Sequence, residues 1–150
     1  MQRLKNDTVW SKQIIEQARW GLILLGFNLR SPKVKSEELR RGLFMAIDRE
    51  DLNRRLTSGR TGIARWLIPD ELIPHNDEER FGFDLLTARD LVRRTPGPRD
   101  FVLAIPANDQ YVRSLAEIIK TQARAADARI ASGNTTPLTS VTVATQRGTS

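Results

Sequence analysis

The sequence of 150 residues predicts an α/β fold, in which a strand and a kinked pair of helices precede a strand-helix-strand unit. Two compact apolar runs, 22–28 and 101–105, have the length and composition of buried strands. The second run is followed by a helical pattern and then by a further strand start at Arg129. This succession is typical of a βαβ unit.

The helical pattern that follows the first strand changes its apolar face partway along, so one straight helix cannot account for it. Asp48 stands at the change of face. A carboxylate at that position can accept hydrogen bonds from the free N–H groups of a helix start, with Asp51 three residues later. We therefore predict two short helices, 36–47 and 49–57, with Asp48 as the N-cap of the second.

Three further helices are predicted from the same signals. Val9, Ile14 and Ile15 give a short helix over 8–20, before the first strand. Asp84 opens a helix that the Thr95-Pro-Gly-Pro98 turn ends, and Asp109 opens another that runs to about residue 126.

The last part of the chain changes in composition. Beyond Ala131 it is rich in Ser, Gly and Thr, and Val141-Thr-Val143 is the only strand-like island. We predict three regions: a helical lead-in over 1–21, a folded region over 22–130, and a poorly ordered tail over 131–150.

Charge and composition give weak indications of function. The 24 basic and 18 acidic residues give a formal charge of +6, which would suit an anionic partner. The basic residues are interspersed with acidic ones, however, so a solvated mixed surface is favoured and a nucleic-acid partner is not expected. The chain contains no cysteine and no apolar run of signal-peptide or membrane-span length, so as written it would stay in the cytoplasm.

The chain shows no pattern typical of an enzyme, a metal site or a bound cofactor. His75 is its one histidine and follows a proline in a polar loop, with no orienting carboxylate specified. The acidic run Asp77-Glu-Glu79 reads as a solvated turn. There is no nucleophile elbow and no Gly-rich phosphate loop.

The most informative motif is the run Leu39-Arg-Arg-Gly-Leu-Phe-Met-Ala-Ile-Asp-Arg-Glu-Asp-Leu52, which follows a strand ending at Phe27-Asn28 and a loop with Pro32. It resembles the helix pair V-R-x-A-x-x-x-A-I-D-R-x-x-L of the solute-binding proteins of peptide and nickel ABC importers. The matching residues are Leu39, Arg40, Ala46, Ile47, Asp48, Arg49 and Leu52, and Gly42 replaces the usual Ala.

The likeness continues in order along the chain, to about Ile130. Phe83-Asp84, with Ala88 and Leu91, resembles the family's Y-D-x-x-x-A-x-x-L helix, and 101–106 with 115–122 resembles its next strand and its L-A-E-x-I-x-x-Q helix. The resemblance implies part of the second lobe of a type II periplasmic-binding-protein-like fold. In that reading Asp48, Arg49 and Asp84 are a structural signature, and Arg49 is expected to pair with Glu50 or Asp84.

The resemblance also implies a function. Such a protein is extracytoplasmic, captures a peptide or other small solute between two lobes by hinge closure, and delivers it to the membrane permease of an ABC importer. The first lobe and the charged residues that hold peptide termini are not matched here, which leaves open whether the isolated chain binds solute. We choose Arg60, Arg65 and Trp66, in the loop 59–66, as candidate ligand contacts. The alternative is the sensor lobe of a cytoplasmic transcriptional regulator.

Overall fold

The structure, a computed structural model, describes residues 21–64, 82–106, 108–133 and 141–147. The elements in chain order are β1 (Gly21–Phe27), the 3-10 helix η2 (Pro32–Val34), α2 (Glu37–Met45), α3 (Arg49–Thr57), α4 (Leu85–Arg94), β2 (Asp100–Ala104), α5 (Gln110–Ala125), β3 (Arg129–Gly133) and β4 (Val141–Arg147). The predicted α/β fold, with its kinked helix pair and strand-helix-strand unit, is confirmed. The helix predicted over 8–20 lies outside the described residues.

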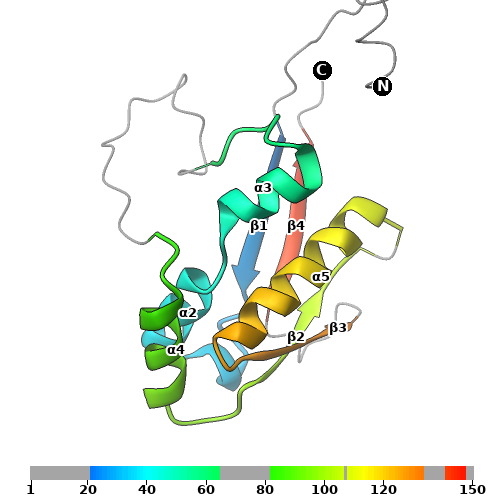
Figure 1. Cartoon of the computed structure of the whole chain (residues 1–150). Coiled ribbons are helices and arrows are strands. Elements are labelled where there is room, and N and C mark those ends of the chain that lie inside the picture. Colours follow the sequence, from blue (N-terminus) through cyan, green and yellow to red (C-terminus); the bar gives the residue numbers. More distant parts are fainter. Residues whose placement is uncertain (1–20, 65–81, 107, 134–140, 148–150) are drawn as a thin grey trace, which may run out of the picture.

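The strands form one sheet in the order β1-β4-β2-β3. β4 pairs antiparallel with β1 and parallel with β2, and β2 pairs parallel with β3. α5 connects the parallel strands β2 and β3, as the βαβ pattern predicted. Figure 1 shows α3 and α5 lying across the sheet, with α2 and α4 beside its lower end.

Each α-helix begins at a side-chain acceptor that the sequence supplies. Ser36 caps α2 by accepting a hydrogen bond from the Leu39 backbone N–H at 3.2 Å. Asp84 caps α4, and Asp109 caps α5. Such caps satisfy N–H groups that the helix itself leaves unpaired, and each typically stabilises a helix by about 1 kcal/mol.

The core lies between the sheet and the helices. Phe101 and Leu103 of β2 are 1% and 0% exposed, and burial of each such side chain contributes roughly 1.5–3 kcal/mol. Leu103 packs with residues from α3 and α5, namely Leu52, Val112, Leu115, Ala116 and Ile119, together with Ile47. Phe101 packs with residues from η2, α2 and α4, namely Val34, Leu39, Leu43 and Val92, together with Ala123 and Ala128.

Two strands differ from the sequence-based expectation. The run 22–28, expected to be buried, forms β1 at one edge of the sheet, where Ile23 is 39% exposed. The region 131–150, expected to be poorly ordered, supplies the end of β3 and all of β4. β4 lies between β1 and β2, so the Val141-Thr-Val143 island is the start of an interior strand. The boundaries of the three predicted regions otherwise stay a prediction.

Candidate functional site

The joint between α2 and α3 is built on Asp48, as predicted. Its backbone is extended (φ −78°, ψ 95°), and its carboxylate accepts a hydrogen bond from the Asp51 N–H at 2.9 Å. The extended residue turns the chain between two helices that have different apolar faces. Asp48 therefore has a structural role, as the N-cap of α3.

Gln122 of α5 holds this joint against the rest of the molecule. Its Oε1 accepts a hydrogen bond from the Asp48 N–H at 3.1 Å, and its Nε2 donates to Asp51 Oδ2 at 3.2 Å. The A-I-D-R motif and the final Gln of the L-A-E-x-I-x-x-Q motif are thus in direct contact. This contact fixes where α3 starts relative to α5, and the sequence reading did not find it.

Asp84 and Arg49 lie near the same joint. The Asp84 N–H donates to the Met45 carbonyl at 3.0 Å, which ties the start of α4 to the end of α2. A hydrogen bond from the Thr87 hydroxyl, with backbone bonds beside it, lowers the pKa of Asp84. The Arg49 guanidinium lies 5.1 Å from the centre of the Phe44 ring, a cation–π contact. Its pairing with Glu50 or Asp84 stays a prediction.

The edge of the sheet where β2 and β3 end is a candidate ligand edge. These two parallel strands end together at Ala104 and Gly133, beside the start of β4, and α5 begins there directly after β2. Ligands of open α/β sheets bind outside the carboxyl ends of the strands. Figure 1 shows the C-terminal end of α3 at the upper end of the molecule, beside the end of β4.

The loop after α3 is tied back to its helix by Asn53. Asn53 Nδ2 donates to the Thr61 carbonyl at 2.7 Å, and Asn53 Oδ1 accepts from the Thr61 hydroxyl at 2.6 Å. Ser58 and Gly59 both have positive φ, 57° and 74°, which turns the chain sharply at the helix end. The loop therefore leaves α3 along a defined path.

Arg60, one of the predicted contacts, lies in this loop and is exposed. Its Nε donates a hydrogen bond to the Thr57 carbonyl at 3.0 Å, which orients the guanidinium at the end of α3. The other two predicted contacts, Arg65 and Trp66, lie outside the described residues, as does His75.

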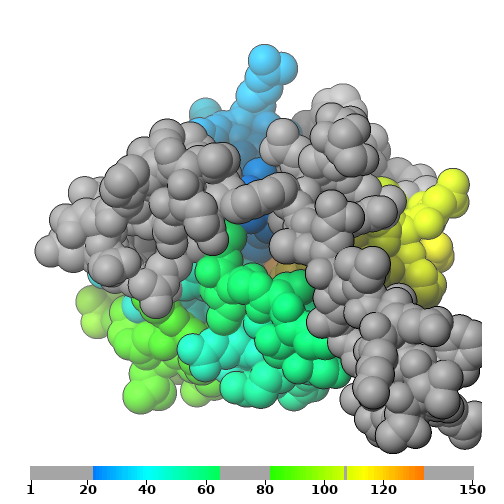
Figure 2. Space-filling model, turned by 90° about the horizontal axis from the view of Figure 1, so that it is seen from above, coloured from blue at the N-terminus to red at the C-terminus, as the bar shows by residue number. Residues whose placement is uncertain are grey.

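The first turn of α5 adds a residue that the sequence reading missed. Asp109 accepts hydrogen bonds from the N–H groups of Tyr111 and Val112 at 3.0 and 3.1 Å, and the Tyr111 side chain is 40% exposed. Partial burial, helped by the negative charge of Asp109, raises the pKa of Tyr111. Figure 2 views the molecule from above and shows both the segment after α3, in green, and the start of α5, in yellow, on this face. The position of Tyr111 just after the helix cap Asp109 was the signal in the sequence that could have identified it.

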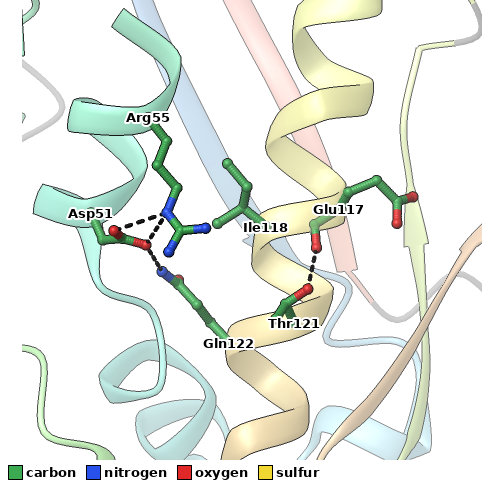
Figure 3. Close-up of a pocket in the computed structure, with 6 residues that line it drawn as sticks. All are labelled: Asp51, Arg55, Glu117, Ile118, Thr121 and Gln122. Carbon is green, nitrogen blue, oxygen red and sulfur yellow. Dashed lines mark hydrogen bonds and ion pairs between the residues drawn. The ribbon is translucent and has the colours of Figure 1, made fainter. Parts of the chain in front are cut away.

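A shallow hollow of about 190 Å³ lies between α3 and α5 (Figure 3). It is lined by Asp51, Arg55, Glu117, Ile118, Thr121 and Gln122. Its polar groups bond one another: Arg55 Nε donates to Asp51 at 2.9 Å, and this bond is the main cause that lowers the pKa of Asp51. Pockets for drug-sized ligands have volumes of roughly 300–1,000 Å³. We therefore interpret the hollow as a structural contact between helices.

The described residues offer no other obvious chemistry. Among them, no three His, Asp or Glu side chains gather closely enough to hold a metal ion. Nor does any helix in the described ranges combine the length and the hydropathy needed to cross a bilayer.

Comparison with protein families decides the identity of the fold. Residues 2–130 match the family described as bacterial extracellular solute-binding proteins, family 5, middle part. The chain belongs to this family. Its members are binding proteins and not enzymes, and they act outside the cytoplasm. A search of curated proteins found no match.

Solved solute-binding proteins share the fold. The dipeptide-binding protein of a Pseudoalteromonas species, in complex with Met-Leu, has a TM-score of 0.73 at 17% identity, over 87% of this chain and 30% of that one. The oligopeptide-binding protein AppA of Bacillus subtilis, in complex with a nonapeptide, has a TM-score of 0.70 at 15% identity, over 87% of this chain and 32% of that one. NikA of Staphylococcus aureus, in complex with Ni(L-His)2, has a TM-score of 0.72 at 16% identity, over 85% of this chain and 30% of that one.

The chain thus spans about 30% of the length of these solute-binding proteins. Within this solute-binding family fold, Asp48 and Gln122 form the joint that sets the α3 direction. The candidate ligand edge lies beside the start of α5 (Figure 1).

Proposed function

We propose that this chain supplies one wall of the cleft in which an extracytoplasmic solute-binding protein captures peptide-like solutes for an ABC importer. The observation that carries the proposal is the family match over residues 2–130. The likeness to proteins solved with a dipeptide and a nonapeptide supports peptides as the solute class. The other wall would come from a part of the protein that this chain does not span.

The wall in this proposal combines the loop after α3 with the candidate ligand edge. Arg60 presents a guanidinium that can bind a peptide carboxylate or carbonyl, and Arg–carboxylate pairs are among the stronger hydrogen-bonded contacts. Tyr111 presents an aromatic face together with a hydroxyl that donates and accepts. Arg65 and Trp66, the other two predicted contacts, are proposed to extend the same wall.

The shape of the edge fits capture by closure. The loop after α3 is fixed at its base by Asn53, while its exposed residues, 58–64, face solvent. An exposed wall of this kind binds solute by itself, and a second wall that closes on it excludes water from the bound solute. Hinge closure onto a peptide, followed by transfer to a permease, is the mechanism we propose for the whole protein.

A thermal-shift titration with defined di- to pentapeptides tests the proposal. At a peptide concentration about 100 times the Kd, binding adds about 2.7 kcal/mol of stability. For a domain of this size that gain corresponds to a rise in Tm of roughly 8 °C.

The Arg60→Ala variant should bind peptide about tenfold more weakly, since it loses a charge-assisted hydrogen bond. Arg54→Ala is the matched control, because Arg54 is an exposed arginine of α3 that pairs with Glu50 and Asp51. No shift with any peptide, or equal weakening by both variants, would contradict a peptide-binding edge at the end of α3.

A further inference from the structure

Basic side chains gather at the end of the molecule opposite to the candidate ligand edge. This end comprises η2, the C-terminal ends of α4 and α5, and the first residues of β2 and β3 (Figure 1). We call it the basic end, and its cationic residues are Lys33, Arg89, Arg93, Arg94, Arg99, Arg124 and Arg129. They are scattered along the sequence, which is why a mixed surface was expected.

Hydrogen bonds join the elements of this end into one continuous surface. The Arg89 guanidinium donates to the Ala125 carbonyl at 2.7 Å, and Arg99 Nη2 donates to the Arg93 carbonyl at 3.1 Å. The Arg129 N–H donates to the Arg99 carbonyl at 2.8 Å. Arginines of α4 therefore lie beside the end of α5, the turn before β2 and the start of β3.

Lys33 extends the basic end to η2. Its Nζ donates to the Asp100 carbonyl at 3.0 Å, beside the ion pair between Arg129 and the Asp100 carboxylate. The surface thus runs from α4 across both strand starts to η2.

The acidic partners at the basic end do not balance its positive charge. Arg93 pairs with Asp127, Arg94 with Asp90, and Arg129 with Asp100. Lys33, Arg89 and Arg99 donate hydrogen bonds to neutral backbone carbonyls. The three paired arginine side chains stay 59%, 74% and 73% exposed, so they can reach a partner while keeping these contacts.

We propose that the basic end binds an anionic phospholipid membrane surface. Exposed arginines spread over a surface suit many diffuse phosphates better than one small ligand. The choice of a membrane rests on the proposed function, because an importer's binding protein works beside a bacterial membrane.

Vesicle flotation of the full chain tests this proposal without any peptide, so its outcome is independent of the peptide experiment. The chain should float with vesicles of equal phosphatidylglycerol and phosphatidylcholine at about 0.1 M salt, where the Debye length is about 10 Å. It should not float with phosphatidylcholine alone, and about 0.5 M salt should release it.

Arg94→Gln/Arg124→Gln removes two charges from the basic end without touching the contacts that join its elements. Each lost charge should lower the partition coefficient about fivefold, and both together about 25-fold. The matched control, Arg54→Gln/Arg113→Gln, removes two exposed charges elsewhere and should lower it less than about fivefold.

Circular dichroism spectra and Tm values should first show that both double variants fold. Equal falls in the partition coefficient of the two double variants would show that only net charge matters, and would overturn the assignment of membrane binding to the basic end. Failure to float with anionic vesicles would overturn the proposal. Tighter binding to duplex DNA than to those vesicles at the same salt would do so as well.

Discussion

Replacing Asp48 by Ala tests the structural interpretation of the family motif. The change removes the carboxylate that accepts the Asp51 N–H at 2.9 Å at the start of α3. Loss of an N-cap typically costs about 1 kcal/mol. Loss of a negative charge at a helix N-terminus costs roughly 0.3–1 kcal/mol more.

The expected total for Asp48→Ala is therefore about 1–2 kcal/mol of unfolding free energy. For a chain of this size, this corresponds to a fall in Tm of roughly 3–6 °C. Urea unfolding followed by circular dichroism measures the first quantity, and a thermal scan measures the second. Peptide affinity of the folded variant should stay unchanged.

Asp48→Asn is the matched control, because Asn keeps a capping oxygen but carries no charge. It should cost only the charge contribution, less than about 1 kcal/mol. An Asn variant as unstable as the Ala variant would show that charge, not capping, matters at this position. An Ala variant of unchanged stability that binds peptide poorly would refute the structural interpretation.

Three other changes probe helix packing, the joint and charge. Gly42→Ala would place a Cβ 3.0 Å from Leu91 Cβ. The packing cost of about 1–3 kcal/mol should exceed the helix-propensity gain of about 1 kcal/mol, so we expect the Tm to fall. A higher Tm would refute the close packing of α2 against α4 at Gly42. Gln122→Leu should lower the unfolding free energy, measured by urea unfolding, by about 1–2 kcal/mol, because it leaves the partly buried Asp48 N–H without its acceptor. An unchanged unfolding free energy would contradict the role of Gln122 at the joint. The hydrogen bond from Arg129 lowers the pKa of Asp100, so this pair contributes stability above about pH 4 that is lost as pH falls. Arg129→Gln should flatten the dependence of unfolding free energy on pH below about 5, and an unchanged slope would contradict the pairing.

Local features of the fold were predictable because their causes lie within a few residues. The cap at Asp48 depends on an N–H three residues away, and the change of apolar face is visible in the same stretch. The caps at Asp84 and Asp109 are equally local. Each is a short side chain placed before a helical pattern, which is a signal that sequence carries directly.

Features that depend on distant pairing were not predictable in the same way. Gln122 lies 74 residues from Asp48, and nothing near it in the sequence indicates their contact. β4 is a strand because β1 and β2 pair with it on both sides, which short patterns cannot show. The exposure of Ile23 follows from the edge position of β1.

The candidate site was predictable in part. Arg60 was chosen from the loop after the kinked helices, and the structure puts this loop at the upper end of the molecule, near the end of β4 (Figure 1). Tyr111 was missed because its helical spacing alone does not show that α5 begins at the candidate ligand edge. The collection of arginines at the basic end was hidden for a similar reason, since α4 and α5 bring it together only in the fold.

The most direct test of the central claim is a two-dimensional ¹⁵N–¹H NMR titration of the chain with the peptide that gives the largest thermal shift. Chemical-shift changes should be confined to 58–64, the loop after α3, and 108–112, the start of α5. Changes centred on the hollow at Asp51 and Gln122, or no changes at saturating peptide, would contradict this claim.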